Sequence, residues 1–322
     1  MTDQKIHDLI IIGGGPAGLT AAIYASRRAL DTLVLTKDIG GQAAQTTEIE
    51  NYPGFDSISG PELMNKFHKQ AEKYGAKFIF QGVTNISQDE TTKIYTITTA
   101  KGEYRAYAII LAFGLEHRKL KVPGELEYYG KGVTYCATCD GPFFKNKEIC
   151  VVGGGSSALD AILYMSKLAT KVHSFVRGEA YRGEEILVDE VKYCSNDEIH
   201  FKTSFTEIKG ESMVKEVIVK DAKTGAEKTM PMQGIFVEIG YQPNITLYKD
   251  LVDLSPAETI IVDQDCRTSR PGFFAAGDIT TISFKQVISS GGQGCIAALS
   301  AYSYIMKQKG IERKIGADWS KK

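Results

Sequence analysis

The stretch DLIIIGGGPAG, residues 8–18, decides how the start of this chain folds. Its apolar run predicts a short buried strand that ends in a glycine-rich turn. A helix with small residues on one side follows over Leu19–Arg28, and a second strand is predicted over Thr32–Thr36. Strand, turn, helix and strand in this order form a βαβ unit, the usual setting of a dinucleotide-binding turn.

Three glycines of this turn have separate roles. Gly13 makes the tight turn, Gly15 lets the backbone approach a pyrophosphate, and Gly18 lets helix and strand pack closely. The acidic residue expected at the end of the second strand is missing, since Thr36 stands there and Asp38 lies just beyond. The ribose contact therefore stays open. The predicted nucleotide contacts of the turn are Gly13, Gly15, Pro16, Ala17 and Gly18.

A cysteine pair lies in the stretch YCATCD, residues 135–140, at the start of another predicted helix. Cysteines three apart can form a small disulfide, and the free N–H groups of a helix start favour a thiolate. Asp140 follows directly and can pass a proton to or from a thiol. We predict a redox-active dithiol of Cys136 and Cys139 with Asp140 as its acid–base. A structural zinc pair or an inert buried pair is the alternative, although zinc needs two further suitably spaced ligands.

A second glycine turn, GGGSSA at residues 153–158, follows a strand over Ile149–Val152 and precedes a helix over Leu159–Leu168. The next strand, Val172–Val176, leads to two arginines. Basic residues at this place suit the 2′-phosphate that distinguishes NADP from NAD, although arginines in a polar loop are often only solvated. The predicted contacts are Gly153, Gly155, Ser156, Ser157, Arg177 and Arg182.

The remaining segments connect and extend the two units. A helix is predicted over 60–74, and an antiparallel insertion over Phe78–Ile86, Ile94–Thr99 and Glu103–Tyr107. A buried strand over Ala108–Ala112 ends at Phe113-Gly114. Later, the stretch PGFFAAGD, residues 271–278, is a strand that ends in a carboxylate, where a cofactor hydroxyl could bind. A long helix is predicted within Gln286–Met306. Ordinary turns are the alternative for these loops.

Length and composition describe an ordinary globular protein of about two domains. Its 322 residues are 43% apolar and 24% charged, and the formal net charge of -1 gives no electrostatic case for nucleic acid or an acidic membrane. The start lacks the layout of a signal peptide, and no apolar run approaches the ~20 residues of a membrane helix. We therefore expect a cytoplasmic, reducing location, where a CxxC pair is more often catalytic than structural.

A dithiol between two nucleotide turns suggests an electron relay, from a nicotinamide or similar donor to a flavin, then the disulfide, then an outside partner. The order and spacing of the motifs resemble the low-molecular-weight thioredoxin reductases of bacterial and archaeal type, among the FAD-dependent pyridine nucleotide-disulfide oxidoreductases. The resemblance runs from Gly13 to about Tyr304. It rests on the two glycine turns, CATCDG at 136–141, GGQ at 40–42, ENYPG at 50–54, AAGD at 275–278 and KQV at 285–287.

The resemblance implies an α/β fold with two Rossmann-like, three-layer ββα dinucleotide-binding domains, the second inserted in the first. The FAD domain would comprise residues 1–116 and 245–322, and the pyridine-nucleotide domain, with the dithiol, residues 117–244, joined by hinges near Glu116-His117 and Gly240-Tyr241. It implies FAD and NADPH as cofactors, thioredoxin as partner and a homodimer. Cys139 would lie nearest the flavin, and Cys136 would attack the thioredoxin disulfide. Further FAD contacts would be Gly41, Gln42, Asn51, Ala112, Gly114, Gly277, Asp278, Lys285, Gln286 and Val287.

Several positions depart from the family pattern. Phe113 replaces a usual threonine, and Ser156 and Asp160 stand where Asn or Asp and Glu are commoner. The basic fingerprint reads VRGEAYR over 176–182, so that two basic positions are lost and Glu179 adds a negative charge. NADH, reduced ferredoxin or a reduced deazaflavin are therefore alternative donors. A ferredoxin–NADP reductase, a redox-sensing flavoprotein and a reductase of a peroxiredoxin remain competing functions, and the role of the tail with Trp319 is open.

Overall fold

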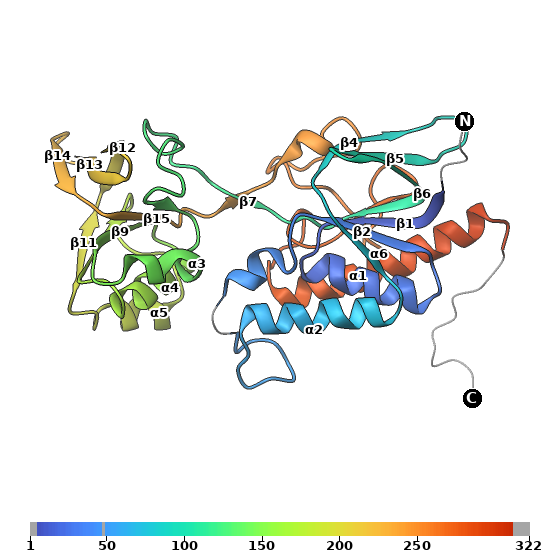
Figure 1. The fold of residues 1–322 in the computed structure, drawn as a ribbon, viewed down its shortest axis with the longest axis horizontal. Coiled ribbons are helices and arrows are strands. Elements are labelled where there is room, and N and C mark those ends of the chain that lie inside the picture. Colours follow the sequence, from blue (N-terminus) through green and yellow to red (C-terminus); the bar gives the residue numbers. More distant parts are fainter. Residues whose placement is uncertain (1–4, 47–48, 312–322) are drawn as a thin grey trace. The chain divides into compact units, whose positions relative to one another are not determined.

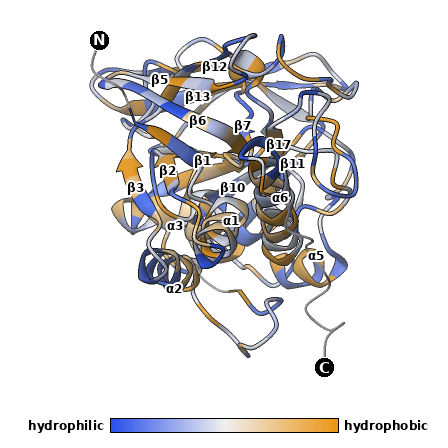
Figure 2. Ribbon diagram, turned by 90° about the vertical axis from the view of Figure 1, so that its right-hand side faces the viewer, coloured by the Kyte–Doolittle hydropathy of each residue, from blue (hydrophilic) through white to orange (hydrophobic). Residues whose placement is uncertain are grey.

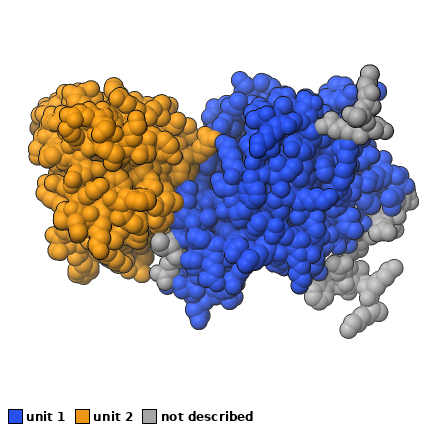
Figure 3. All heavy atoms as spheres, in the orientation of Figure 1, with its two compact units in different colours: residues 1–115, 243–322 blue, residues 116–242 orange. Residues whose placement is uncertain are grey.

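The computed structural model describes residues 5–46 and 49–311 and divides the chain into two units (Figure 3). Unit 1 comprises residues 1–115 and 243–322, and unit 2 comprises residues 116–242, so unit 2 is an insertion in unit 1. The family resemblance implies boundaries after residues 116 and 244, and the division into units falls after residues 115 and 242. The tail residue Trp319 lies outside the described residues.

Unit 1 is built on a mixed sheet. Its strands are β1 (Ile6–Ile12), β2 (Thr32–Thr36), β3 (Lys77–Phe80), β4 (Val83–Gln88), β5 (Tyr95–Thr99), β6 (Gly102–Leu111) and β17 (Phe273–Ala275). The strand order is β3-β2-β1-β6-β5-β4, and β17 pairs with β6. The pairs among β3, β2, β1, β6 and β17 are parallel, whereas β4 and β5 run antiparallel to their neighbours. The parallel part carries the predicted βαβ unit.

Alternate residues of β1 face two different cores. Leu9 and Ile11 pack towards the helices α1 (Pro16–Arg27), α2 (Gly60–Lys73) and α6 (Val287–Gln308), which lie on one side of the sheet (Figure 1). Ile10 and Ile12 pack on the opposite side with residues of β4 and β5. A strand buried on both faces reads as a continuous apolar run, which is why LIII marks β1 so clearly. The visible side of α2 is mostly hydrophilic (Figure 2), as expected for an outer helix.

Two predicted strand boundaries in unit 1 are wrong. The segment Phe78–Ile86 is two strands, because the chain breaks at Gln81-Gly82 and β3 joins the parallel part while β4 turns away. Conversely, the two strands predicted over residues 103–112 are the single strand β6. Its first half pairs antiparallel with β5, and the rest pairs parallel with β1.

Unit 2 repeats the three-layer plan. Its parallel sheet has the order β11-β10-β9-β15-β8, with β8 (Val133–Thr134), β9 (Glu148–Val152), β10 (Lys171–Val176), β11 (Asp197–Phe201) and β15 (Gly234–Val237). The helices α3 (Ala137–Asp140), α4 (Ser156–Ser166) and α5 (Glu185–Val191) lie on one side in Figure 1. An antiparallel sheet of β12 (Thr203–Gly210), β13 (Val214–Asp221) and β14 (Glu227–Pro231) packs on the other through an apolar core. The sequence predicts strands around Val214–Lys220 and Gly234–Ile239, which are β13 and β15, and one around His200–Thr203, which spans the end of β11 and the start of β12. It does not predict α5, β8 or β14.

Short elements complete the chain. β7 (Glu116–His117) pairs antiparallel with β16 (Tyr241–Gln242) at the two ends of unit 2, where the sequence had placed the hinges. Three 3-10 helices are η1 (Gly41–Gln45), η2 (Gly141–Phe144) and η3 (Ile245–Leu247). In the part of the chain that the structure describes, no helix is both long and apolar enough to cross a membrane.

Candidate active site

The cysteine pair is joined as a disulfide at the start of α3. Cys136 is the residue that caps this single-turn helix, and its Sγ accepts a hydrogen bond of 3.2 Å from the backbone N–H of Cys139. The two Cα atoms are 5.3 Å apart. Cys139 is exposed and Cys136 is half-buried. The helix start therefore directs an amide at the sulfur of Cys136, which favours a negative charge there when the disulfide is open.

The hydroxyl of Thr134 links the acid to the dithiol. Thr134 Oγ1 donates a hydrogen bond to Asp140 Oδ2, and it accepts the backbone N–H of Cys136 at 3.2 Å. The carboxylate of Asp140 and the backbone of Cys136 are therefore both held by the Thr134 side chain, at the end of β8. Thr134 could not be predicted from the sequence, because nothing in its spacing marks a residue that acts through two others.

A buried carboxylate anchors the segment before the dithiol. Glu125, 2% exposed, accepts the Tyr135 hydroxyl at 2.7 Å and the backbone N–H groups of Leu120 and Lys121 at 2.7 Å each. Burial and this carboxylate raise the pKa of the Tyr135 hydroxyl. Satisfying a buried carboxylate with three donors fixes the chain that enters α3.

The glycines of the first turn fall into two groups according to what surrounds them. A Cβ on Gly13 would collide with the backbone of Ala112, and one on Gly18 would collide with the carbonyl of Gly13. By contrast, a Cβ on Gly15 would have the Gly40 carbonyl oxygen as its nearest atom, at 3.9 Å. A Cβ on Gly41 would have the Cα of Gly15 as its nearest atom, also at 3.9 Å. The protein itself fills the space beside the first two glycines and leaves a cradle between the other two.

Loop contacts hold this cradle. Gly40 N–H donates to the Gly14 carbonyl at 2.7 Å, and Gly41 N–H donates to Asp38 Oδ1 at 3.1 Å. Thr36 Oγ1 donates to the Asp38 carbonyl at 2.7 Å. The acid beyond β2 therefore stabilises the loop that faces the glycine turn.

The end of β17 brings a carboxylate next to the starts of α1 and α6. Ser290 Oγ donates to Asp278 Oδ1 at 2.9 Å, and Lys285 Nζ donates to the Asp278 carbonyl at 2.6 Å. Gly277 N–H donates to Gln293 Oε1 at 2.8 Å. Burial lowers the pKa of Lys285, although Asp278 partly opposes the shift. Ser290 and Gln293 were missed, since they lie inside a helix with no motif around them.

Most other residues predicted to contact FAD converge on the same end of unit 1. Asn51 Nδ2 donates to Gln286 Oε1 at 3.3 Å, across 235 positions of sequence, and Gln286 caps α6, which begins at Val287. Gln42 Nε2 donates to the Leu115 carbonyl at 2.9 Å. Ala112 and Gly114 follow β6, and Ala112 lies against Gly13. Pro16 and Ala17 begin α1.

The second glycine turn reproduces the pattern of the first. A Cβ on Gly153 would collide with the carbonyl of Glu238, whereas a Cβ on Gly155 would have no atom within 4 Å. Arg182 N–H donates to the Gly154 carbonyl at 2.6 Å, and Glu184 N–H donates to Ser156 Oγ at 3.1 Å. The loop with the arginines therefore packs beside the turn, and the open space at Gly155 remains.

The charged residues after β10 are two exposed arginines and one paired glutamate. Arg177 and Arg182 are exposed, and among the described residues no ion pair is recorded for either. Glu179 pairs with Lys202 at 2.6 Å. The added acid is thus balanced by a lysine rather than by either arginine.

Glu238 is a titratable residue between turn and dithiol that the sequence analysis missed. It follows β15, its carbonyl lies against Gly153, and the backbone amide of Ala137 faces its carboxyl group. Burial, with the charge of Asp160 nearby, raises the pKa of Glu238 to about 8. It reads in sequence as an ordinary residue after a strand.

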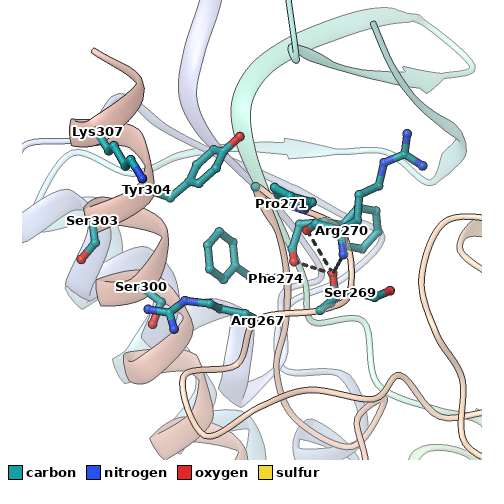
Figure 4. Close-up of a pocket in the computed structure, with 12 residues that line it drawn as sticks. Arg267, Ser269, Arg270, Pro271, Phe274, Ser300, Ser303, Tyr304 and Lys307 are labelled. Atoms are coloured by element: carbon teal, nitrogen blue, oxygen red, sulfur yellow. Dashed lines mark hydrogen bonds between the residues drawn. The ribbon is translucent and has the colours of Figure 1, made fainter. Parts of the chain in front are cut away.

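A cavity of about 380 Å³ lies away from these residues (Figure 4). Its lining includes Arg267, Arg270, Ser300, Tyr304 and Lys307, from the segment before β17 and the second half of α6. The predicted FAD contacts Gly277, Asp278 and Val287 lie after β17 and at the start of α6. The cavity therefore belongs to no part of the predicted site.

Comparison with known proteins gives one consistent family. The model of the pyridine nucleotide-disulphide oxidoreductases matches residues 7–294. A thioredoxin reductase of Listeria innocua is 40% identical over 310 residues, which are 96% of this chain and 97% of that protein. A bifunctional thioredoxin reductase/thioredoxin of Mycobacterium leprae is 39% identical and covers 95% of this chain and 68% of its own length.

A solved structure agrees with the fold. The thioredoxin reductase of Lactococcus lactis, in its FR conformation, superposes with a TM-score of 0.87 at 39% identity, over 94% of this chain and 99% of that one. The α/β fold predicted from the sequence, with two Rossmann-like three-layer domains, is confirmed.

Proposed function

The chain belongs to the pyridine nucleotide-disulphide oxidoreductase family and is a thioredoxin-disulfide reductase within it, and on that premise we propose the route of its electrons. They pass from a nicotinamide nucleotide to FAD in unit 1, then to the Cys136–Cys139 disulfide of unit 2, and then to the disulfide of thioredoxin. The observation that carries this proposal is the disulfide of a CxxC pair, with Cys139 exposed, beside a tethered carboxylate.

The open cradle in unit 1 fits FAD. Gly15 and Gly41 leave room for a pyrophosphate where the other glycines are filled by protein, and the first N–H groups of α1 suit its charge. We propose that Asp278, held by Ser290, binds a hydroxyl of the cofactor, and that Asn51, Gln286 and Lys285 complete the site. FAD, when bound, accepts a hydride from a nicotinamide and returns electrons to a disulfide.

The dithiol then carries two electrons and two protons. Opening the Cys136–Cys139 bond with two electrons and two protons gives two thiols. The Cys136 thiolate attacks one thioredoxin sulfur, which forms a mixed disulfide and releases the other thioredoxin sulfur as a thiolate. Cys139 next attacks Cys136 Sγ, which restores the internal disulfide and frees reduced thioredoxin. Asp140, oriented by Thr134, moves the protons.

We propose NADPH as the donor, favoured only modestly over NADH. Gly155 leaves the space that a pyrophosphate needs, and Arg177 and Arg182 are exposed beside it. The pairing of Glu179 with Lys202 supports this assignment, since it removes much of the repulsion against a 2′-phosphate. Reduced ferredoxin or a reduced deazaflavin remains the second candidate because half of the basic fingerprint is absent.

Partner and assembly follow the relatives. The fusion of reductase and thioredoxin in the Mycobacterium leprae protein supports thioredoxin as the acceptor. A homodimer and a cytoplasmic location are further proposals that rest on the family resemblance and on a dithiol that works in a reducing compartment.

The deciding experiment is reduction of a thioredoxin disulfide by the purified holoprotein, followed as release of thioredoxin thiols. NADPH, NADH and a low-potential donor are tested in turn without oxygen, and bleaching of the flavin absorbance is recorded beside thiol release. Cys139→Ser is the control, expected to retain FAD and to lose thiol release. A flavoprotein that bleaches with a donor but releases no thioredoxin thiol would instead be a ferredoxin–NADP reductase or a redox sensor.

A further inference from the structure

A cluster of two histidines and two glutamates lies on the face of the unit 2 sheet that the β12–β14 sheet covers. Glu148, His173, Glu198 and His200 come from β9, β10 and β11, and the parallel register sets His173 beside Glu198. His173 is 2% exposed, which is unusual for an imidazole, while the side chains of His200 and Glu198 are 19% and 48% exposed. The thioredoxin reductase chemistry uses none of them.

The donor atoms of three of these residues are close enough to share one ion. His173 Nδ1 and His200 Nε2 are 3.1 Å apart. A carboxylate oxygen of Glu198 lies 3.5 Å from His200 Nε2, and the other lies 3.9 Å from His173 Nδ1. Ligands at about 2.0–2.2 Å from a tetrahedral ion stand roughly 3.3–3.5 Å apart. The distances within the cluster bracket this spacing.

Glu148 prepares His173 as a ligand. Its Oε1 lies 2.8 Å from His173 Nε2, so this ring nitrogen donates its N–H to Glu148 and Nδ1 is the acceptor nitrogen, which faces His200 Nε2. A metal-bound histidine commonly donates its other N–H to a carboxylate in this way.

The local charges leave room for a divalent cation. Lys171 pairs with Glu198 Oε2 at 2.5 Å and Lys228 lies near His200, so two lysines oppose the two glutamates. Glu198 Oε1, the oxygen nearest His200, is not the one that Lys171 holds. An ion can therefore bind through Oε1 while the lysine contact persists.

We propose that His173 Nδ1, His200 Nε2 and Glu198 form a binding site for a divalent transition metal of the zinc class, oriented by Glu148. Two imidazoles and one carboxylate are a ligand set of such sites, with a fourth position for water. On binding, the N–H that bridges the two rings moves from His200 Nε2 to its Nδ1, so no proton is released. The ion would tie β10, which leads to Arg177, to the edge strand β11.

The test uses the oxidised holoprotein, because the closed Cys136–Cys139 disulfide removes those thiols as competing ligands. Zn²⁺ is added after treatment with a chelator, and bound metal is counted by equilibrium dialysis. We expect one ion per chain in the wild type, none in His200→Gln or Glu198→Gln, and one in the control His68→Gln. The histidine of this control lies in unit 1 on α2. Glu148→Gln should weaken Zn²⁺ affinity by about 10–100-fold.

Co²⁺ supplies a second readout. Its absorption at wavelengths longer than those of the flavin should show a tetrahedral ligand field in the wild type and in His68→Gln and should disappear in Glu198→Gln. Zn²⁺ should also raise the Tm of the wild type but not that of Glu198→Gln. Because the Glu198 side chain is partly exposed, this variant should have the wild-type Tm in the absence of metal, which shows that it is folded. Absence of stoichiometric Zn²⁺ in the wild type, or binding that survives both ligand variants, overturns the proposal.

Discussion

Thr134 shows how one hydroxyl can serve a dithiol from outside the motif. We expect Thr134→Val to lower kcat for thioredoxin by about 10-fold, less than the roughly 10²–10⁴-fold that general acid–base catalysis contributes, because Asp140 stays in place and loses only the donor that orients it. The pH profile of kcat should shift as well, which a merely structural role would not cause. Thr206→Val, in β12, is the matched control and should leave the profile unchanged. An unaltered profile in Thr134→Val would mean that Asp140 is oriented by other groups.

The proposed preference for NADPH depends on Arg177 and Arg182, the arginines after β10. A charge-assisted contact to phosphate contributes about 1.5–3 kcal/mol, and a tenfold preference needs about 1.4 kcal/mol. We expect Arg177→Ala and Arg182→Ala each to reduce the ratio of kcat/KM for NADPH over NADH by up to about tenfold, with the NADH value almost unchanged. The measurement is steady-state kinetics with both nucleotides.

The ion pair of Glu179 and Lys202 offers a sharper control for the same site. Lys202→Ala leaves the carboxylate uncompensated and should lower the NADPH preference, whereas Glu179→Gln should raise it. If neither variant changes the preference and neither nucleotide reduces the flavin, while reduced ferredoxin does, the second turn is a structural strand–helix connection.

Glu238 predicts an unusual pH dependence of stability. Its pKa is about 8 in the folded protein against an ordinary value of 4.5, so between these pH values the folded state binds a proton that the unfolded state lacks. The contribution of Glu238 to the free energy of unfolding is therefore fully present below about pH 4.5 and is lost as the pH rises towards 8. The free energy of unfolding of Glu238→Gln should be close to that of the wild type near pH 5 and should exceed it increasingly up to pH 8.5, by on the order of 4 kcal/mol. A constant difference across this range would exclude a neutral Glu238.

The two glycine turns test the distinction between filled and open positions. Gly15 has φ −80°, which alanine adopts freely, and its Cβ would point into the cradle. Gly15→Ala should therefore leave the Tm of the apoprotein unchanged and weaken FAD binding. Gly18→Ala should lower the Tm of the apoprotein, since its Cβ meets the Gly13 carbonyl. Titration of both apoproteins with FAD checks this, and equal apoprotein Tm values would contradict the assignment.

Motifs with strong local patterns were predictable as elements. The apolar run of β1 and the glycines after it predicted the βαβ unit: β2 has the predicted bounds, whereas α1 begins at Pro16, three residues before the predicted Leu19. The helix α5 was missed because seven residues, EILVDEV, show too little periodicity to separate helix from loop. The division of residues 78–86 depends on which neighbour each half pairs with, and pairing is set by distant parts of the chain rather than by local sequence.

Residues that act through others could not be predicted in the same way. Thr134, Ser290 and Gln293 hold Asp140, Asp278 and Gly277 from positions that no spacing connects to them. The Glu179–Lys202 pair likewise depends on strand β11 ending beside the loop after β10. Such partners follow from tertiary packing, so the sequence located the reacting groups better than the groups that orient them.

The insertion of unit 2 in unit 1 leaves each unit with a core of its own. Among the described residues, every buried apolar cluster lies within a single unit, such as the one around Ile110 in unit 1 and the one around Ile235 in unit 2. Chain connections at β7 and β16 join them. Units with separate cores can unfold separately, so one Tm is not a sufficient description of this protein.

We therefore predict two calorimetric transitions that respond to different changes. Ile110→Ala and Ile235→Ala remove equivalent, fully buried side chains and should each cost about 2–5 kcal/mol in its own unit, lowering one transition and leaving the other. FAD at 100 times its Kd should stabilise unit 1 by about 2.7 kcal/mol and so raise the temperature of the transition that Ile110→Ala lowers. A bound nicotinamide nucleotide should raise the temperature of the other transition. If FAD moved the transition that Ile235→Ala lowers, the cradle of Gly15 and Gly41 would not be the flavin site. A single transition moved by both substitutions would show that the two cores unfold as one.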